Sequence, residues 1–462
     1  MAAQQQQMGK TAIVIGASMA GLLAARTLAD YFAHVTILER DILPTSGEPR
    51  KGVPQGQHTH ALLASGQQIL EELFPGLTQH LVNQGAVQGH GRFFSAGGYH
   101  CRIQKHPGGL FVSRPRLEAE VRARLLAFSH VHIIENCDVR GLAVDEERTR
   151  VIGVRIIRRQ SVSAEEILPA DLVVDASGRG SRTPAWLEAL GYPKPDVELV
   201  EVGMGYATRI YRRQVEHLDG DLFVNVAPTP ENKRACGMLA QEGERWIVTL
   251  AGYFGDYPPT DEQGFLEFAR SLPVPDVYEV IRTATPLSDP IPFRFPANQR
   301  RHYEKLTRFP DGLLVFGDAI CSFTPIYGQG MTVAAQETLA LRECLAGGTH
   351  QLARRFFKQA SRVVDIAWSI TVGNDLSLSD AEGSQTRMMR FINWYMRKLQ
   401  LAARHDPGLA FAFQRVANLI AAPSSLLHPL IALQVLWGNL RLARHAQSGT
   451  AQQESLSQPL HP

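Results

Sequence analysis

The sequence predicts an α/β fold in three parts: a parallel sheet flanked by helices, an antiparallel sheet inserted into it, and a C-terminal helical region. Short apolar runs that end in glycine, at residues 11–15 and 312–316, indicate buried parallel strands. Alternating apolar and polar residues from about residue 195 indicate antiparallel strands. Helical spacing of apolar residues over 376–446 indicates the third part.

The first strand leads into a turn and a helix over residues 19–30. Gly16 lets the chain turn sharply, and Gly21 allows the helix to pack closely on the strand. The start of such a helix presents free N–H groups and a partial positive charge, which suit a pyrophosphate. Ser18 replaces the middle glycine of the G-x-G-x-x-G pattern, and its hydroxyl can donate a hydrogen bond. The segment predicts a Rossmann-like dinucleotide site.

A second strand, over residues 34–39, ends in Glu39, which Arg40 follows. In dinucleotide folds an acid about 20 residues after the first glycine accepts hydrogen bonds from ribose hydroxyls. We expect the nucleotide to bind at these strand ends and the turn between them, through Gly16, Ser18, Ala20, Gly21, Glu39 and Arg40.

A segment much later in the chain returns to the same sheet. The strand 312–316 ends at Gly317-Asp318, and an Asp at the carboxyl end of a parallel strand lies where cofactors bind in open α/β sheets. Its natural partner is a ribityl or ribose hydroxyl. A nicotinamide enzyme needs only the first segment, whereas a flavoenzyme needs both, so the pair predicts bound FAD.

The residues after Asp318 predict a flavin-facing loop. Pro325, Gly328 and Gly330 precede an Ala- and Leu-rich helix that begins at Met331. Glycines leave the helix N-terminus accessible, and its dipole suits the anionic N1–C2 edge of a reduced isoalloxazine. We expect Asp318, Gly330 and Met331 to bind FAD, with Pro325, Gly328 and Gly330 facing its reactive edge.

These segments resemble the class A flavoprotein monooxygenases, the aromatic hydroxylases and squalene-epoxidase-like enzymes. Residues 317–331 are similar to their second FAD fingerprint. Arg114 stands in an R-x-x-L element, and the resemblance implies that this Arg contacts FAD. Residues 50–63 are similar to a segment of bacterial polyether epoxidases. The resemblance covers about residues 9–345.

The electron source is less defined by the resemblance. Many of these hydroxylases carry an Asp-Gly motif linked to FAD and NAD(P)H, but the matching run, residues 171–182, has Ser177 in place of that Asp. A similar Asp-Ala-Ser-Gly-Arg run occurs in prenyl reductases and flavin halogenases. We therefore expect NAD(P)H to supply electrons directly or through a partner flavin reductase. The Trp-x-Trp-x-Ile-Pro motif of halogenases is absent, because the five Trp are isolated.

The composition argues against several other classes. The formal net charge of +2 gives no general argument for nucleic acid binding. Five widely spaced cysteines without a CxxC pair favour reduced thiols over a disulfide framework. We recognise no signal peptide, and no apolar stretch reaches the roughly 18 residues of a spanning helix. We therefore expect a cytoplasmic protein, with peripheral membrane contact as an alternative.

The order of predicted elements makes the FAD-binding domain discontinuous, with a substrate domain whose sheet covers the flavin. The expected boundaries are 9–90, 107–190 and 305–375 for the FAD-binding domain, 91–106 and 191–304 for the substrate domain, 376–446 for the C-terminal helical region, and 447–462 for a disordered tail.

The C-terminal helical region, residues 376–446, is basic, with eight Lys or Arg and three Asp or Glu. A basic, amphipathic helical region can lie on an anionic membrane. The pattern favours the alternative, in which the region packs over the substrate domain with its Arg residues in water. Pro407, Pro423 and Pro429 divide the region into several helices.

Aromatic residues predict the walls of an apolar substrate pocket, although core packing explains them equally well. His58 and His60 have the residue type of metal ligands, but no neighbouring Cys or acidic cluster completes a site. We therefore expect no metal and place both histidines beside FAD or the pocket wall. The expected pocket residues are Gln57, His58, His60, Phe293 and Phe295, together with Phe93, Phe94 and Tyr99.

These motifs predict an FAD-dependent monooxygenase acting on a lipophilic or aromatic secondary metabolite. Reduced FAD would add O2 at C4a, and this hydroperoxide would deliver one oxygen atom by hydroxylation or epoxidation. Two alternatives stay open. One is a reductase or dehydrogenase of the prenyl-reductase type, favoured by the run from Asp175 to Gly178. The other is a non-enzymatic, membrane-associated flavin-binding protein. No residue is identified as a catalytic base.

Overall fold

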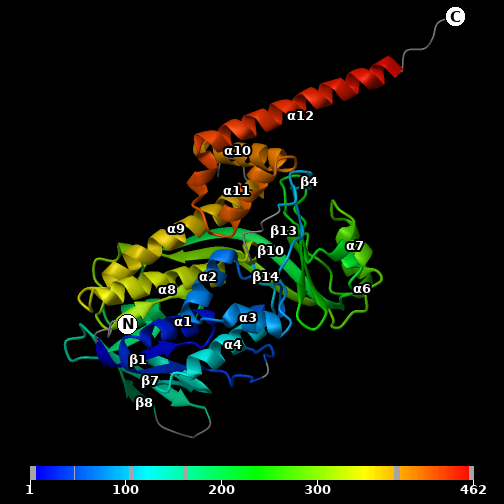
Figure 1. The fold of residues 1–462 in the computed structure, drawn as a ribbon. Coiled ribbons are helices and arrows are strands. Elements are labelled where there is room, and N and C mark those ends of the chain that lie inside the picture. Colours follow the sequence, from blue (N-terminus) through cyan, green and yellow to red (C-terminus); the bar gives the residue numbers. More distant parts are fainter. Residues whose placement is uncertain (1–6, 46, 104–108, 160–164, 379–385, 457–462) are drawn as a thin grey trace, which may run out of the picture.

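The computed structural model describes residues 7–45, 47–103, 109–159, 165–378 and 386–456, with side chains described as far as residue 444. Figure 1 shows a parallel sheet with its helices near the N-terminus, a second sheet beside it, and the last helices stacked beyond that sheet. This confirms the predicted α/β fold, with a Rossmann-like domain, an inserted antiparallel sheet and a C-terminal helical region.

The first sheet is parallel and has five strands, in the order β15-β9-β1-β2-β5. β1 (Gly9–Ile15) lies between β2 (Phe32–Leu38) and β9 (Leu172–Asp175). β15 (Leu313–Val315) joins β9, and β5 (Val131–Ile134) joins β2. The strands of the two predicted FAD segments therefore lie in one sheet, with only β9 between them and their carboxyl ends at the same edge.

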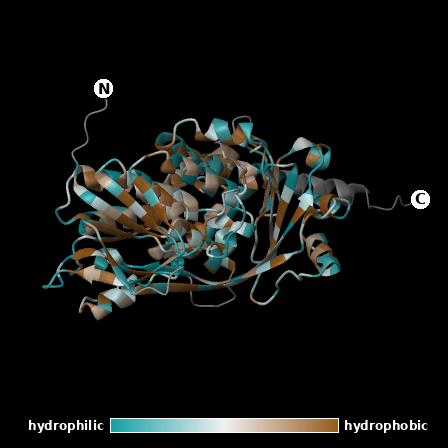
Figure 2. Cartoon of the chain, turned by 90° about the horizontal axis from the view of Figure 1, so that it is seen from below, coloured by the Kyte–Doolittle hydropathy of each residue, from teal (hydrophilic) through white to brown (hydrophobic). Residues whose placement is uncertain are grey.

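Helices pack on this sheet and share its apolar core. α1 (Met19–Leu28) and α8 (Gly330–Ala346), which follow the two FAD segments, contact each other. α9 (Leu352–Leu378) and α2 (Ala64–Leu73) pack on α8, and α4 (Arg114–Leu126) packs on α1. Apolar residues gather in the sheets and on the helix sides that face them (Figure 2).

Shorter elements connect these parts. They are η1 (Pro54–Gln57), α3 (Leu77–Asn83), α5 (Thr183–Ala189), η2 (His217–Gly220), η3 (Tyr303–Lys305), η4 (Gly317–Ala319), η5 (Pro325–Tyr327), and a three-stranded sheet of β6 (Cys137–Val144), β7 (Val151–Arg158) and β8 (Glu166–Pro169).

The second sheet has the order β16-β14-β10-β13-β12-β11-β3-β4. Its centre is antiparallel, because β10 (Val197–Arg212) pairs with β13 (Arg245–Tyr253) on one side and β14 (Ile291–Arg301) on the other. The outer strands are β3 (Arg92–Ser95), β4 (Gly98–Tyr99), β11 (Phe223–Val226), β12 (Ala235–Gln241) and β16 (Cys321–Ser322).

The two faces of the second sheet have different roles. Side chains alternate along β10, so Ala207 and Tyr211 pack beneath α6 (Glu262–Arg270) and α7 (Asp276–Ile281). Met204, Tyr206 and Thr208 point to the opposite face, where Met204 and Tyr206 pack with Phe295 and Ile326, and Thr208 contacts His58.

The C-terminal region has an apolar cluster of its own, and its Leu419 is buried in the core of the first sheet. It consists of α10 (Arg387–Ala403), α11 (Pro407–Ala417), η6 (Pro423–Leu427) and α12 (Pro429–Leu456). α12 extends to residue 456, whereas we expected disorder from 447; residues 457–462 lie outside the described residues. α9 runs across the expected boundary at 375/376 as one continuous helix. The domain boundaries themselves stay a prediction.

Candidate functional site

The turn after β1 is built so closely that only glycine fits at two positions. Gly16 has a φ of +101°, and a Cβ there would lie 2.7 Å from the Ala176 carbonyl oxygen. A Cβ at Gly21 would lie 1.8 Å from the Gly16 carbonyl oxygen. The two glycines therefore bring α1 directly onto the strand end, and the start of the helix faces the carboxyl edge of the sheet.

The start of α1 fits a pyrophosphate. Ser18 occupies the N-cap position, yet its side chain makes no capping hydrogen bond to the helix. The preceding N–H, that of Ala17, donates to Glu39 Oε2 at 2.8 Å. A helix start without a side-chain cap retains N–H groups for an anionic ligand. Glu39 follows β2 directly and is buried, in the position expected for a ribose-binding acid.

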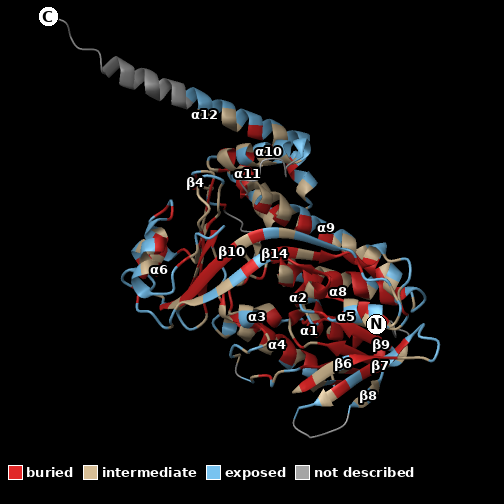
Figure 3. Ribbon diagram, turned by 180° about the vertical axis from the view of Figure 1, so that it is seen from behind, coloured by how far each residue is buried: buried red, intermediate tan, exposed pale blue. Residues whose placement is uncertain are grey.

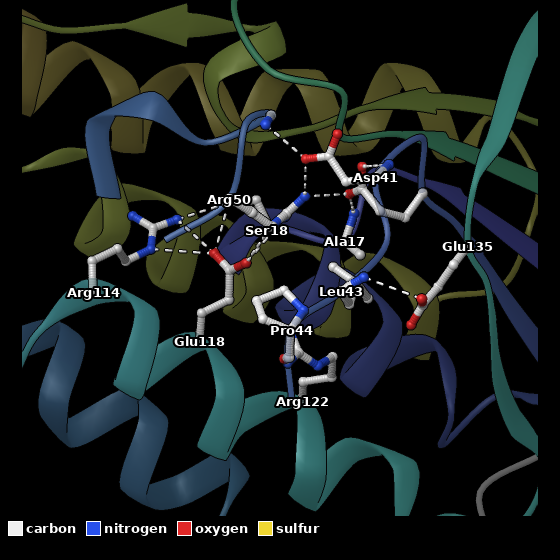
Figure 4. A network of polar contacts seen from close by, with 12 residues as sticks. Ala17, Ser18, Asp41, Leu43, Pro44, Arg50, Arg114, Glu118, Arg122 and Glu135 are labelled. Carbon is white, nitrogen blue, oxygen red and sulfur yellow. Dashed lines mark hydrogen bonds and ion pairs between the residues drawn. The ribbon is translucent and has the colours of Figure 1, made fainter. Parts of the chain in front are cut away.

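Figure 4 shows a network of charged side chains at this helix start. Arg114 Nη2 donates to Ser18 Oγ at 2.8 Å, and Ser18 Oγ donates to Glu118 Oε2 at 3.1 Å. Arg50 bridges the acids, with 3.0 Å contacts to Glu118 Oε1 and Glu39 Oε2. Burial alone would lower the pKa of Arg50, but Glu118 and Glu39 raise it above its ordinary value. The predicted Ser18, Glu39 and Arg114 thus meet, held by two residues that sequence reasoning missed.

The second FAD segment packs directly on the first. Gly317 has a φ of +66°, and a Cβ there would lie 2.7 Å from Ala20 Cβ. Asp318 follows β15 and lies beside Gly330, with one carboxylate oxygen 3.7 Å from where a Cβ of Gly330 would be. Burial raises the pKa of Asp318, while the guanidinium groups of Arg114 and Arg179 oppose that shift. This carboxylate is placed to accept a sugar or ribityl hydroxyl between the two segments.

Glu337 of α8 is hydrogen-bonded to the backbone of the second segment. Its side chain is fully buried, and its Oε2 accepts a 2.7 Å hydrogen bond from the Gly317 N–H. Its Oε1 has no partner among the described residues. Burial raises the pKa of Glu337 to about 8, which the hydrogen bond from Gly317 only partly opposes. The buried carboxyl group therefore holds a proton at neutral pH and anchors the turn that presents Asp318.

The run from Asp175 to Arg182 forms a turn that is tied to both segments. Asp175 accepts hydrogen bonds from the hydroxyls of Ser177, Ser181 and Thr183, at 2.5, 2.6 and 2.5 Å. The Ser177 hydroxyl is therefore engaged within the turn. Arg301 joins this turn to the second segment, since it donates to the carbonyl of Arg179 at 2.7 Å and of Ala319 at 2.8 Å.

An aromatic cluster lies on the face of the second sheet that carries Tyr206 and Thr208. The ring of His58 packs 4.8 Å from Tyr206 and 5.5 Å from Phe293, and the two latter rings stack at 5.3 Å. His58 Nδ1 is 2.8 Å from Thr208 Oγ1, and burial lowers the pKa of His58 to about 4. Phe295 lies in the same apolar cluster, and the guanidinium of Arg179 sits 5.2 Å from its ring. The predicted His58, Phe293 and Phe295 are brought together.

His60 and Gln57 lie next to this cluster, on the loop that contains His58. His60 Nδ1 donates to the His58 carbonyl at 3.0 Å, and burial, with Arg114 nearby, lowers the pKa of His60 to about 3. Gln57 lines a cavity of about 400 Å³ under the same sheet face. Ile210, Ile247 and Ile291 form part of its apolar wall. A cavity of this size accommodates a small organic molecule.

A buried acid stands directly behind the predicted flavin-facing loop. Asp375 of α9 accepts hydrogen bonds from Asn298 Nδ2 at 2.7 Å, Thr324 Oγ1 at 2.6 Å and Tyr327 Oη at 2.8 Å. Burial raises the pKa of Asp375, and these three donors oppose the shift. Tyr253 Oη is buried beside Tyr327 and makes no well-formed hydrogen bond with a described residue. The loop that begins at Pro325 is thus fixed by a helix far along the chain.

Several other predicted residues lie elsewhere. Arg40 is exposed beside Asp138, whose pKa is lowered by Arg159 and, to a smaller extent, by Arg40; its contact with a nucleotide stays a prediction. Phe94 and Tyr99 pack with the cluster under α6 and α7, on the sheet face away from the cofactor site, so they do not line the pocket. Phe93 contacts Phe413 of α11, with ring centroids 5.5 Å apart. In the described ranges, no group of three or more His, Cys, Asp or Glu could hold a metal ion.

Comparison with known proteins agrees with this geometry. A family model described as an FAD binding domain matches residues 10–354. Protein Rv3254 of Mycobacterium tuberculosis is 33% identical over 425 residues, which cover 88% of this chain and 89% of the relative.

Solved structures share the fold at low sequence identity. The flavin-dependent brominase Bmp2 has a TM-score of 0.66 at 13% identity, covering 95% of this chain and all of its own. The p-nitrophenol 4-monooxygenase PnpA of Pseudomonas putida DLL-E4 has a TM-score of 0.60 at 15% identity, covering 89% of this chain and 99% of its own. The chain therefore belongs to the FAD-binding-domain family and is a flavoprotein oxidoreductase with the fold of the flavin-dependent monooxygenases.

Proposed function

We propose that this enzyme uses FAD and O2 to insert one oxygen atom into a lipophilic or aromatic small molecule. FAD would be held by the α1 start, Glu39, Arg114 and Asp318, and it supplies the activation of O2. The observation that carries the proposal is the aromatic cluster of His58, Tyr206 and Phe293, which packs next to the loop of the second FAD segment and adjoins a cavity of about 400 Å³.

The pocket suits an apolar, ring-containing substrate. The cavity has Ile210, Ile247 and Ile291 on the sheet side, next to the aromatic cluster of β10 and β14. Its other side is charged, with Glu48, Arg116, Glu242 and Arg245. Burial lowers the pKa of His58 to about 4, so its imidazole is uncharged at neutral pH and can still form hydrogen bonds. Dry walls favour transfer of oxygen to the substrate, because water competes for reactive species in an open site.

Tyr327 and Asp375 provide the proton acceptor that a phenolic substrate needs. A substrate hydroxyl can pass its proton to Tyr327 Oη as Tyr327 passes its own to Asp375 Oδ1, across the 2.8 Å hydrogen bond. Asp375 then carries the proton and the substrate is left as the more electron-rich phenolate. Hydroxylation of a phenol uses Tyr327 and Asp375, whereas epoxidation of an alkene does not need them because no proton is removed.

Electron delivery is proposed to come from NAD(P)H, directly or through a partner reductase. Ser177 stands where many hydroxylases have an Asp, and its hydroxyl donates a hydrogen bond to Asp175 within the same turn. This favours delivery by a separate flavin reductase. Stopped-flow reduction of the holoprotein by NADPH or NADH alone tests the point: slow reduction that a reductase accelerates supports the partner, and fast direct reduction refutes it.

The decisive experiment is oxygen labelling. Purified holoprotein is supplied with reducing equivalents, an extract of small molecules and 18O2, and products are followed by mass spectrometry. A product that gains one labelled oxygen supports monooxygenation, and a Tyr327→Phe variant that loses activity on phenols but not on alkenes supports the proton pair. A product that gains or loses only hydrogen, with slow reoxidation of the flavin in air, identifies the reductase or dehydrogenase alternative.

A further inference from the structure

α12 is apolar on two opposite faces. One face, with Ile431, Val435 and Gly438, packs on the other C-terminal helices; Val435 is buried, and Gly438 lies against Ala402 of α10. The opposite face carries five large apolar side chains with exposed fractions of 47–65%. They recur every three or four positions and so form one stripe along the helix. We call this stripe the α12 outer face: Leu430, Leu433, Leu436, Trp437 and Leu440.

α10 adds a second exposed apolar group. Tyr395 and Leu399 fill the cluster beneath, but the same helix side continues toward the N-terminus without cover. Met388 is 65% exposed, Phe391 53% and Trp394 56%, and the rings of Phe391 and Trp394 lie 5.9 Å apart. Figures 1 and 3 show both helices at the end of the molecule farthest from the parallel sheet, with α12 projecting outward. Large apolar side chains gathered on exposed helix faces mark an interaction site.

The charges around this surface are almost all positive. From Arg387 to Arg444 the chain carries eight Lys or Arg and one acid, Asp406. Arg390 and Lys398 flank Trp394 on α10, and Arg441 follows the α12 outer face, whereas Arg397 is paired with Glu231 at 3.3 Å. Arginines of the C-terminal helices are exposed to solvent, as expected, and the leucines and tryptophan of the α12 outer face are exposed as well.

We propose that the α12 outer face, with the exposed start of α10, docks this protein on an anionic lipid bilayer. Leucine and tryptophan insert at the boundary of headgroups and acyl chains, and flanking Arg and Lys bind the anionic headgroups. Two copies of the chain joined through this surface would bring their arginines together, so the charge favours lipid over self-association. No helix in the described residues is long and apolar enough to cross a bilayer, so the contact is peripheral.

The test is vesicle binding by the full-length holoprotein. Wild type is incubated with vesicles of phosphatidylcholine alone or mixed with phosphatidylglycerol, and the bound fraction is measured by flotation. We expect binding to the mixed vesicles that weakens as salt is raised. Leu433→Ser with Trp437→Ser should weaken it by about tenfold or more, because two inserted side chains are lost. Arg390→Gln with Arg441→Gln should weaken binding to the anionic vesicles only.

The matched control is Ile167→Ser on β8, which removes an equally exposed apolar side chain, 62% exposed, from a remote edge. It should bind vesicles like wild type. FAD content and melting temperature identify any variant that is misfolded. Wild type that fails to bind either vesicle overturns the proposal. So does a concentration-dependent dimer, seen by sedimentation equilibrium, that the Leu433 and Trp437 changes abolish while vesicle binding is unaffected.

Discussion

At the scale of single residues, the FAD site depends on side chains that are absent as much as on those that are present. Gly21 sits in a helix, where Ala is normally the better residue, yet a Cβ there would overlap the Gly16 carbonyl at 1.8 Å. We expect Gly21→Ala to displace the start of α1, to abolish retention of FAD, and to lower the free energy of unfolding by about 4 kcal/mol or more.

Gly373→Ala is the matched control for that change, because Gly373 also lies in a helix and a Cβ there would meet no other atom within 4 Å. The Gly373→Ala protein should retain FAD fully, and its free energy of unfolding should rise by up to about 1 kcal/mol. FAD absorbance of the purified proteins and urea denaturation measure both effects. Gly21→Ala protein that retains stoichiometric FAD would refute the tight-turn account.

Glu337 makes a second prediction at this scale, on pH. Its pKa is about 8 in the folded protein against an ordinary value of 4.5, so the native state holds a proton that the unfolded chain releases. Its contribution to stability is fully present below about pH 4.5 and is lost as the pH rises through about 8, at about 1.4 kcal/mol per pH unit in between. Glu337→Gln keeps an oxygen for the Gly317 N–H and cannot ionise.

The difference in stability between Glu337→Gln and wild type should therefore shift in favour of the variant as pH rises from 5 to about 8. Urea denaturation at several pH values measures this difference. Glu343→Gln, an exposed change on the same helix, should show no such trend. A pH-independent difference for Glu337→Gln would show that the carboxyl group is ionised in the native state.

At the scale of elements, local patterns were sufficient for the parts that carry the FAD segments. β1 and α8 begin within two residues of the predicted starts at Thr11 and Met331, because the pattern of a buried strand or of a helix is contained in neighbouring residues. The loop containing Arg50 has no regular period, so nothing in the sequence indicated that it would bridge Glu39 and Glu118. Contacts between distant irregular segments have no local signal.

Asp375 was missed for a related reason. It lies on α9, beyond the matched FAD-binding family region, and reads in sequence as a polar position on a helix. Only the packing of α9 on α8 brings it behind the loop at Thr324 and Tyr327. The same packing explains why α9 continues across the expected domain boundary.

Asp375 and Tyr327 lead to a prediction about this packing. Asp375→Ala leaves the Asn298 amide and the Tyr327 hydroxyl without their acceptor, whereas the Thr324 hydroxyl keeps Asn298 Oδ1. At about 1–3 kcal/mol for each unsatisfied group, a loss of roughly 2 kcal/mol or more is expected. Tyr327→Phe removes one hydrogen bond and should cost about 1 kcal/mol. Urea denaturation of both variants gives the comparison, and equal losses would contradict a central role for the acid.

At the scale of the whole molecule, the apolar clusters show which helices share a core with which sheet. α9 belongs to the core of the parallel sheet as far as residue 372, and Leu378 at its end packs in the cluster that lines the pocket. α10, α11 and α12 form their own cluster, which contacts Cys101, Ile103 and Ile370. The segment after α11 also reaches the core of the parallel sheet, where Leu419 is buried and Asn418 Oδ1 accepts a hydrogen bond from the Ala64 N–H. The C-terminal helices therefore have a core of their own, and the segment after α11 joins them to α2 and α8.

Truncation after Leu378 tests this division. We expect the shortened chain to retain FAD with unchanged stoichiometry, because none of the residues at the α1 start or around Asp318 contacts the removed helices. Its melting temperature should fall by a few degrees and its solubility should decrease, since Ile103 and Ile370 lose their cover. FAD absorbance and thermal denaturation follow the two properties separately. Loss of FAD on truncation would show that the C-terminal helices are needed to form the cofactor site.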